Sequence, residues 1–587
     1  MKGKPRWSSG REAVLGKGIA VKSRSRILWL SAALLMAASA PARAQNQPAA
    51  GVLGAMKVEL SRSLQTLKQQ PTPPYFLGYE ITEDRVIAVA GSYGKIEASG
   101  ETCRRQLDID LRVGDYSLDN THSLRSDSLS LSDYFRYSFI EVPIEDDAEA
   151  IRSVLWYHTD RAYKGAVEQF TKVKTNVEVK VEQEDRSADF SRETPEKYVE
   201  PLAPLGVDQR AWEEKIRKYT APFARYGNIY EGEATFTADR ETRWYTNSEG
   251  AEIQVSQTYY YLILSGFTKA ADGMELPRYE TFYALSPADL PDDATVLKVV
   301  EKMIADLEAL RTAPIVEPYT GPAILSGRAG GVFFHEVFGH RIEGHRQKAE
   351  DESQTFKKKV NEKILPENFS VYADPTVRRL AKTDLVGTYR YDNEGVKARR
   401  VPLVENGVLK NFLMSRSPIE GFLHSNGHGR RQQGFVPVAR QSNLLVEVSH
   451  PVSRAELKRM LLEQVKKQNL PFGLFFDDIE GGFTFTQRTI PNAFNVLPVM
   501  VYKIYPNGRE ELVRGVDLIG TPLIAFSRIV AGDDQPAVFN GICGAESGSV
   551  PVAALSPGIL ISQIEVQKKE KSQERPPLLP PPFEVRQ

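Results

Sequence analysis

The chain has 587 residues, of which 41% are hydrophobic and 26% are charged, as in ordinary globular proteins. A single hydrophobic core stops growing at about 250–300 residues, so this length predicts at least two domains. The formal net charge is −1, and no basic stripe or long Lys/Arg tract follows the first 44 residues. This composition argues against a nucleic-acid partner.

The first 44 residues resemble a secretory signal peptide. A basic region leads into an apolar run from Ile27 to Met36, and small residues follow as far as an Ala-Arg-Ala sequence that ends at Ala44. The run is shorter than the about 20 residues that cross a bilayer, and an uncleaved membrane anchor is the alternative. These residues hold nine of the 75 Lys and Arg and one of the 76 Asp and Glu, so the remaining chain has a formal charge of −9. We expect a cleaved signal at residues 1–44 and an exported mature chain, periplasmic or extracellular, with no membrane span.

Residues 45–312 are predicted to form an N-terminal domain of helices and largely antiparallel strands. Apolar residues at helical spacing indicate helices over residues 52–67, 146–172 and 292–310. Alternating apolar and polar residues indicate strands at 107–113 and 177–181. The Tyr-, Thr- and Val-rich region 226–288 favours an antiparallel meander.

A segment punctuated by Pro and Gly leads into a predicted C-terminal domain of residues 313–565. Within it, Ser453 and Glu456 form a capping box that opens a helix, and residues 472–563 are mostly strands and turns. Arg430-Arg431 is interpreted as a solvated pair rather than as a site for a peptide carboxylate. The tail, residues 566–587, is charged and then Pro-rich, and we expect it to be disordered. The predicted fold class is α+β, with two domains.

The clearest chemical signature is the sequence His-Glu-x-x-x-His, formed by His335, Glu336 and His340. It is one residue longer than the His-Glu-x-x-His of common zinc proteases, in which both histidines bind zinc and the glutamate is the general base. The chain has only eight histidines, so a chance arrangement of this kind would be rare. Three unrelated residues of a buried helix are the alternative interpretation.

The extra residue has a geometric consequence. Positions i and i+4 lie about 40° apart around an α-helix, but positions i and i+5 lie about 140° apart. Two imidazoles on a regular helix could therefore not easily share one metal ion. A π-bulge at this point would bring them onto one face, and Gly339 tolerates such a distortion. The sequence predicts a distorted metal-binding helix.

A catalytic zinc has three protein ligands and one open position for water, and the motif supplies two of the three. The chain has two cysteines, Cys103 and Cys543. In an exported protein the default expectation is a disulfide between them.

The sequence from His335 to Gly344, His-Glu-Val-Phe-Gly-His-Arg-Ile-Glu-Gly, resembles the signature of the TldD/PmbA family of metallopeptidases. A second block that resembles the family, Asn-Gly-Ile-Cys-Gly-Ala-Glu-Ser-Gly-Ser-Val-Pro-Val, begins at Asn540. Residues 514–520 resemble the strand that leads towards this block. The resemblance covers about residues 315–563 well, whereas residues 49–312 match the order of elements rather than any motif.

The resemblance implies that zinc is held by His335, His340 and Cys543 and that Glu336 is the catalytic base. A thiolate is a good zinc ligand. The disulfide then becomes the lesser alternative, because Cys103 has no counterpart in the family. His345 stands where the family tends to have an acidic residue, and we interpret it as a surface residue rather than as a support for a ligand.

The resemblance also implies the function: a zinc-dependent peptidase that hydrolyses small or unfolded peptides bound in extended conformation. The expected assembly is a homodimer, or a heterodimer with a related subunit. Two alternatives stay open, an amidase or other modifying hydrolase with the same site, and a non-catalytic, peptide-binding partner subunit. The complete His-Glu-His-Cys set argues against the second alternative. Many family members are cytoplasmic, so the export signal puts the family's usual substrates and partners in doubt.

Overall fold

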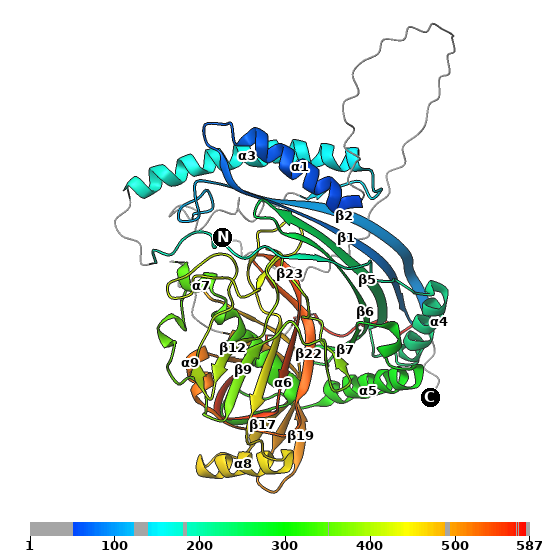
Figure 1. Cartoon of the computed structure of the whole chain (residues 1–587). Helices are drawn as coiled ribbons and strands as arrows, with labels where there is room; N and C mark the ends of the chain where they lie inside the picture. The colour runs from blue at the N-terminus through cyan, green and yellow to red at the C-terminus, as the bar shows by residue number, and fades with distance from the viewer. Residues whose placement is uncertain are drawn as a thin grey trace, which may run out of the picture. The chain divides into compact units, whose positions relative to one another are not determined.

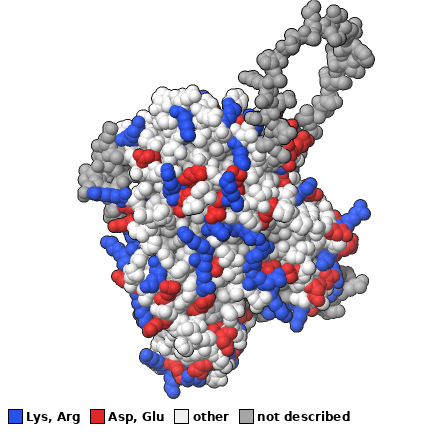
Figure 2. All heavy atoms as spheres, viewed as in Figure 1, with Lys and Arg blue, Asp and Glu red and all other residues white. Residues whose placement is uncertain are grey.

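The computed structural model describes residues 51–122, 139–179, 185–349, 352–487, 494–570, 572 and 574–582. These residues belong to one compact unit that begins at Pro48. The predicted signal peptide, residues 1–44, lies outside the described residues. Within the described ranges, no helix combines the length and the apolar character needed to cross a membrane. On the face shown in Figure 2, basic and acidic side chains are interspersed.

The N-terminal half is built on one seven-stranded sheet. Its strands follow the order β3-β2-β1-β5-β6-β4, with β7 also paired to β6, and every pairing except β4–β6 is antiparallel. The strands are β1 (Pro74–Ser92), β2 (Lys95–Val113), β3 (Ile140–Glu141), β4 (Lys197–Val199), β5 (Glu231–Asn247), β6 (Glu252–Lys269) and β7 (Glu275–Ala284). The helices are α1 (Gly51–Leu67), α3 (Ala148–Val179), α4 (Gln209–Thr220) and α5 (Asp293–Thr312).

The two faces of this sheet differ in chemistry because successive side chains of a strand point to opposite sides. On β1, Leu77, Tyr79 and Ile81 pack under α1 and α3, and Ile87 and Val89 pack under α4 and α5. Figure 1 shows α1 and α3 lying together along the sheet. In the middle of β1 the alternate positions Glu80, Thr82 and Asp84 are polar, and Glu80 and Asp84 accept hydrogen bonds from loops of the C-terminal half.

Buried polar contacts join this second face to the C-terminal half. Glu80 accepts hydrogen bonds from Asn393 at 2.9 Å and from Arg431 at 3.2 Å. Asp108, which lies opposite Glu80 on β2, accepts one from the backbone N–H of Gly434 at 2.9 Å. Buried charges of this kind are tolerated only when they are paired and hydrogen-bonded. The contact between the two halves therefore depends on these specific pairs of polar groups.

The C-terminal half has two larger sheets. In one, β17, β8, β24, β20 and β18 pair in sequence and a β17–β18 pairing closes the path; in the other, the order is β13-β12-β9-β16-β23-β22. The elements of the first are β8 (Tyr319–Leu325), β17 (Gly473–Thr484), β18 (Phe494–Ile504), β19 (Glu510–Val513), β20 (Val516–Gly520), β21 (Ile529–Gly532) and β24 (Ile559–Lys568). Those of the second are β9 (Phe369–Ala373), β12 (Val401–Glu405), β13 (Val408–Leu409), β16 (Asn443–Val448), β22 (Ala537–Ala545) and β23 (Gly548–Ser556).

Helix α6 (Gly327–Val337) lies between these two sheets and contacts strands of both. All of its residues except Arg328 are buried, as expected of a mostly apolar helix that is packed between two sheets. Gly331 allows the close contact with β23, because a Cβ there would lie 2.9 Å from the carbonyl oxygen of Ala554. Phe333 and Phe334 pack against Phe526 on α9 (Pro522–Ser527). This core holds α6 in place.

The α+β class and most predicted elements are confirmed. Helices α1, α3 and α5 and the meander β5–β7 occupy the predicted regions. Helix α8 (Arg454–Lys467) begins at the predicted cap, where the Ser453 hydroxyl accepts from the N–H of Glu456. The predicted strand at 177–181 is wrong for residues 177–179, which continue α3; residues 180 and 181 lie outside the described residues. The domain boundary near residue 313, between α5 and β8, stays a prediction.

Candidate metal centre

The first two residues of the motif lie in the last turn of α6. The helix begins after Ser326, whose hydroxyl accepts a hydrogen bond from the N–H of Ala329 at 3.2 Å, a standard N-cap. His335 and Glu336 follow near its C-terminal end, and both are buried. The packing of α6 between two sheets therefore determines where these two side chains lie.

The predicted distortion is present, but its form is not a π-bulge. Helix α6 ends at Val337, and a 3₁₀ turn, η4 (Gly339–Ile342), carries His340. Phe338 lies between them with φ −113° and ψ −54°, and its carbonyl accepts from the N–H of Arg341 at 2.8 Å. The tighter turn redirects the chain enough to bring both imidazoles together. Gly339 allows a close contact with Gln441: a Cβ there would lie 1.9 Å from Oε1 of Gln441, so the Gln441 side chain would have to move.

The structure brings His335, His340 and Cys543 together. One ligand atom from each lies within 4.8 Å of the other two, and the two imidazole rings are 4.9 Å apart between centroids. Sγ of Cys543 is 3.4 Å from Nε2 of His340. With Zn–N of about 2.1 Å and Zn–S of about 2.3 Å, a tetrahedral zinc would hold these atoms roughly 3.6 Å apart. The three side chains therefore fit zinc in donor type and in spacing.

The electrostatics of the site favour a thiolate at Cys543. Burial by itself would raise the pKa of this thiol, but the neighbouring His340 and His335 hold the pKa well below its usual value. Arg440, fully buried, donates to Sγ of Cys543 at 3.2 Å and to its carbonyl oxygen at 2.7 Å. A thiolate is the form of cysteine that binds metals.

Glu343 contacts the ring nitrogen of His340 that does not face Cys543. Its carboxylate is 0% exposed and accepts a hydrogen bond from Nδ1 of His340 at 3.3 Å, which leaves Nε2 facing the Sγ of Cys543. Arg346 donates to the same carboxylate at 2.8 Å. Burial would raise the pKa of Glu343, but His340 and Arg346 lower it to about 2. A carboxylate in this position sets the tautomer and orientation of a histidine that binds metal.

Glu336 points into the site without belonging to the three-ligand group. One of its carboxylate oxygens lies 4.0 Å from Nε2 of His340. Burial raises the pKa of Glu336 above its usual value, against the opposing effects of His335 and His340. Gly482 on β17 makes room for it, since a Cβ there would lie 2.7 Å from Cγ of Glu336. A buried carboxylate with a raised pKa beside a metal position suits a general base.

A second cluster adjoins the first. Glu343, His345 and Glu546 bring ligand atoms within 4.8 Å of one another, but Arg346 donates to both Glu343 and Glu546, so their charges are already balanced. His345 is hydrogen-bonded to Glu546. His345 is partly exposed, as expected of a residue near the surface, but through Glu546 it is linked to Arg346, which pairs with Glu343 behind His340.

The arginine pair at 430–431 and the two cysteines also differ from what the sequence first suggested. Arg430 is buried and the Arg431 side chain is only 9% exposed, so the two are not a solvated pair. Arg430 donates to the carbonyls of Gln441 and Pro551, and Arg431 pairs with Glu80 and Asp108. Cys103 and Cys543 are both free thiols, so the disulfide is absent from this structure.

No pattern in the sequence predicted the contact of Arg440 with Cys543. Arg440 precedes β16 and is separated from Cys543 by about a hundred residues, so no spacing pattern connected it with the ligands. The only local sign is that Arg440 and the polar residues after it, Gln441, Ser442 and Asn443, lead directly into an apolar strand.

Removing Cys543 should affect metal binding in a way that removing Cys103 does not. We expect Cys543→Ala to lose zinc, because the site would keep only two protein ligands, and Cys103→Ala to keep a full complement. The measurement is metal content per chain after purification without chelator. Equal zinc in wild type and Cys543→Ala would reject Cys543 as a ligand, and a Cys103–Cys543 linkage in a non-reducing peptide map would reject it directly.

Glu343→Gln should weaken zinc binding about 10–100-fold, because the amide no longer gives His340 a charged acceptor. The matched control is Glu352→Gln, which removes another carboxylate that pairs with Arg346. Zinc affinity of both variants can be measured by competition with a chromophoric chelator. The supporting role assigned to Glu343 is wrong if both variants lose affinity equally or if neither does.

Part of the chain is similar to known metallopeptidases. Residues 318–568 match the profile of the PmbA/TldA metallopeptidase C-terminal domain. A protein named metalloprotease from Archaeoglobus fulgidus is 30% identical over 238 residues, which cover 40% of this chain and 51% of that protein. A zinc metalloprotease TldD homolog from Saccharolobus solfataricus is 22% identical over 250 residues, covering 42% and 51%. The chain thus spans about half the length of these two relatives.

A solved structure shares the fold. TldE from Thermococcus kodakarensis matches with a TM-score of 0.57 and 14% identity, over 87% of this chain and 100% of that one. At this identity the likeness concerns the fold alone, and it extends well into the N-terminal half, beyond the matched C-terminal domain. Residues 318–568 thus match the C-terminal domain of the PmbA/TldA metallopeptidases, and the fold of the chain is similar to that of TldE.

Proposed function

We propose that this protein is a zinc peptidase that cleaves small or unfolded peptides. The observation that carries the proposal is the convergence of two imidazoles and a thiolate in a buried site, with Glu336 beside them. The relatives named metalloprotease support the same class of activity.

Glu336 and Arg341 would have different roles in the proposed hydrolysis. A bound zinc would polarise the scissile carbonyl and lower the pKa of its water. Glu336 would take the proton of the attacking water on a carboxylate oxygen and pass it to the leaving amine. Arg341 fixes the turn that follows Glu336, because its guanidinium donates to the Glu336 carbonyl at 2.9 Å and to the Phe485 carbonyl at 3.0 Å.

An extended substrate is supported by the position of β22. This strand carries Cys543 and pairs only with β23 among the strands of the described chain, so no described strand lies along its other edge. Ile542, next to Cys543, is 55% exposed. A strand edge without a partner strand offers backbone groups to which a peptide can add as a further strand, although the carbonyl of Cys543 already accepts from Arg440. Binding through the backbone would select extended peptides with little dependence on side chains.

Two other functions remain as alternatives. An amidase or other modifying hydrolase would use the same residues on a non-peptide substrate, and a partner subunit would bind peptides without cleaving them. Zinc content together with peptide turnover separates the three. The predicted homodimer, or heterodimer with a related subunit, also stays a prediction.

Glu336→Gln should keep zinc and lose turnover, because Glu336 is proposed as a base and not as a ligand. Loss of a general base costs about 10²–10⁴-fold in rate. The measurement is mass spectrometry of a peptide pool incubated with wild type and variant, beside metal analysis of both. Glu352→Gln serves as the control for a lost buried carboxylate. Activity of Glu336→Gln within a few-fold of wild type would assign the base to another residue.

We also propose that the mature protein is exported and begins near Gln45. The supporting observation is the apolar run before the Ala-Arg-Ala sequence at residues 42–44. N-terminal sequencing of protein from the extracytoplasmic fraction should return a sequence that starts near Gln45. An intact Met1 on cytoplasmic protein would contradict export.

A further inference from the structure

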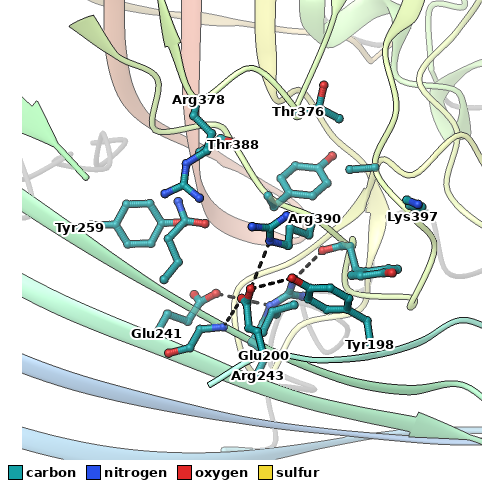
Figure 3. Close-up of a pocket in the computed structure, with 16 residues that line it drawn as sticks. Tyr198, Glu200, Glu241, Arg243, Tyr259, Thr376, Arg378, Thr388, Arg390 and Lys397 are labelled. Carbon is teal, nitrogen blue, oxygen red and sulfur yellow. Dashed lines mark hydrogen bonds and ion pairs between the residues drawn. The ribbon is translucent and has the colours of Figure 1, made fainter. Parts of the chain in front are cut away.

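A polar cavity of about 290 Å³ lies between the two halves of the chain, among residues outside the group at the metal centre. One wall is the polar face of the N-terminal sheet, with Glu241 and Arg243 on β5 and Tyr259 on β6. The opposite wall is the segment 376–398 of the C-terminal half, which includes Arg378 and Arg390. Figure 3 shows these side chains around the cavity. Its volume is close to the lower end of small-molecule sites, about 300 Å³.

Three of the six charged side chains that line this cavity, Glu200, Arg243 and Arg390, already have partners. Glu200 accepts from the Tyr198 hydroxyl at 3.0 Å and from the N–H of Ser256 at 2.9 Å, and it pairs with Arg390 at 3.2 Å. Arg243 donates to the carbonyl of Tyr391 at 2.6 Å. These two groups therefore stabilise the walls.

Three charged groups are left for a ligand. Arg378 and Lys397 line the cavity, are exposed, and form no ion pair within the described ranges of the chain. Glu241 has only a 3.5 Å contact with Arg243. The cavity thus offers unpaired positive charge and one weakly paired carboxylate between aromatic walls.

This combination matches a zwitterion better than a simple anion. A carboxylate would pair with Arg378, whose planar fork suits carboxylate geometry, while an ammonium group would pair with Glu241. Inorganic phosphate would meet repulsion from Glu241 and Glu200 and would leave the tyrosine rings uncovered. We propose that this cavity binds a short peptide with free termini, of about dipeptide size, and that Arg378 recognises its carboxylate.

The inference goes beyond the proposed function and does not depend on it, because none of the residues that carry it touches the metal centre. A bound dipeptide would be held by the junction of the two halves. Its binding would therefore favour the arrangement in which the N-terminal sheet and segment 376–398 are in contact.

The test is calorimetric titration of the full chain with Ala-Ala and with its C-terminal amide. The protein is zinc-loaded Glu336→Gln, titrated again after the zinc has been stripped, and chromatography of the probe reports any hydrolysis separately. We expect the free acid to bind at least tenfold more tightly than the amide, equally with and without zinc.

The double variant Arg378→Gln/Lys397→Gln should lose at least tenfold in affinity for Ala-Ala. Both side chains are exposed, so folding should be unaffected, and an unchanged Tm checks this. Lys382→Gln is the matched control, since Lys382 lies near Arg378 in the chain and is exposed but does not line the cavity.

Four outcomes would overturn the proposal: equal affinity for acid and amide, unchanged affinity in the double variant, binding only in the presence of zinc, or tighter binding of inorganic phosphate than of Ala-Ala.

Discussion

The buried contact between Cys543 and His340 is the interaction on which the metal centre depends. A thiolate in the interior is costly unless charges of the opposite sign surround it. Here His340, His335 and Arg440 surround the sulfur, and Glu343 balances His340 and Arg346 in turn. The network alternates in sign from Cys543 to Glu546, so no described member of it is left as an isolated buried charge.

The network holds together because two unrelated parts of the fold meet at this point. Helix α6 supplies His335 and Glu336 from between two sheets, and β22 supplies Cys543 from the edge of one of them. Gly339 and Gly482 allow approaches that a side chain would block, against Gln441 and Glu336 respectively. A metal ion in this position would link helix and strand, so zinc binding and local stability should be coupled.

The polar face of the N-terminal sheet has a comparable role on a larger scale. An apolar face would have joined the halves by burial alone, whereas Glu80 and Asp108 join them through specific charged and hydrogen-bonded partners. Polar interfaces of this kind leave space that water or a ligand can occupy. The cavity between Glu241 and Arg378 is such a space, and it lies where the two halves meet.

The sequence by itself determined the elements with strong local signals and pointed to the first two candidate ligands. Helical spacing predicted α1 and α5, the capping box predicted α8, and His-Glu-x-x-x-His predicted a distorted helix end, because these signals depend on neighbouring residues. The third ligand came only from the family resemblance, since spacing carries no information over the distance from His340 to Cys543.

Only the tertiary structure decided the remaining features. The chain leaves α6 through a 3₁₀ turn rather than a π-bulge, with Gly339 close to Gln441. Residues 177–179 are helical although their pattern alternates. Arg430 is buried and the Arg431 side chain is 9% exposed, because the loops and the sheet provide carbonyl and carboxylate acceptors. These acceptors lie far from the two arginines in the sequence, and a single sequence does not reveal such contacts.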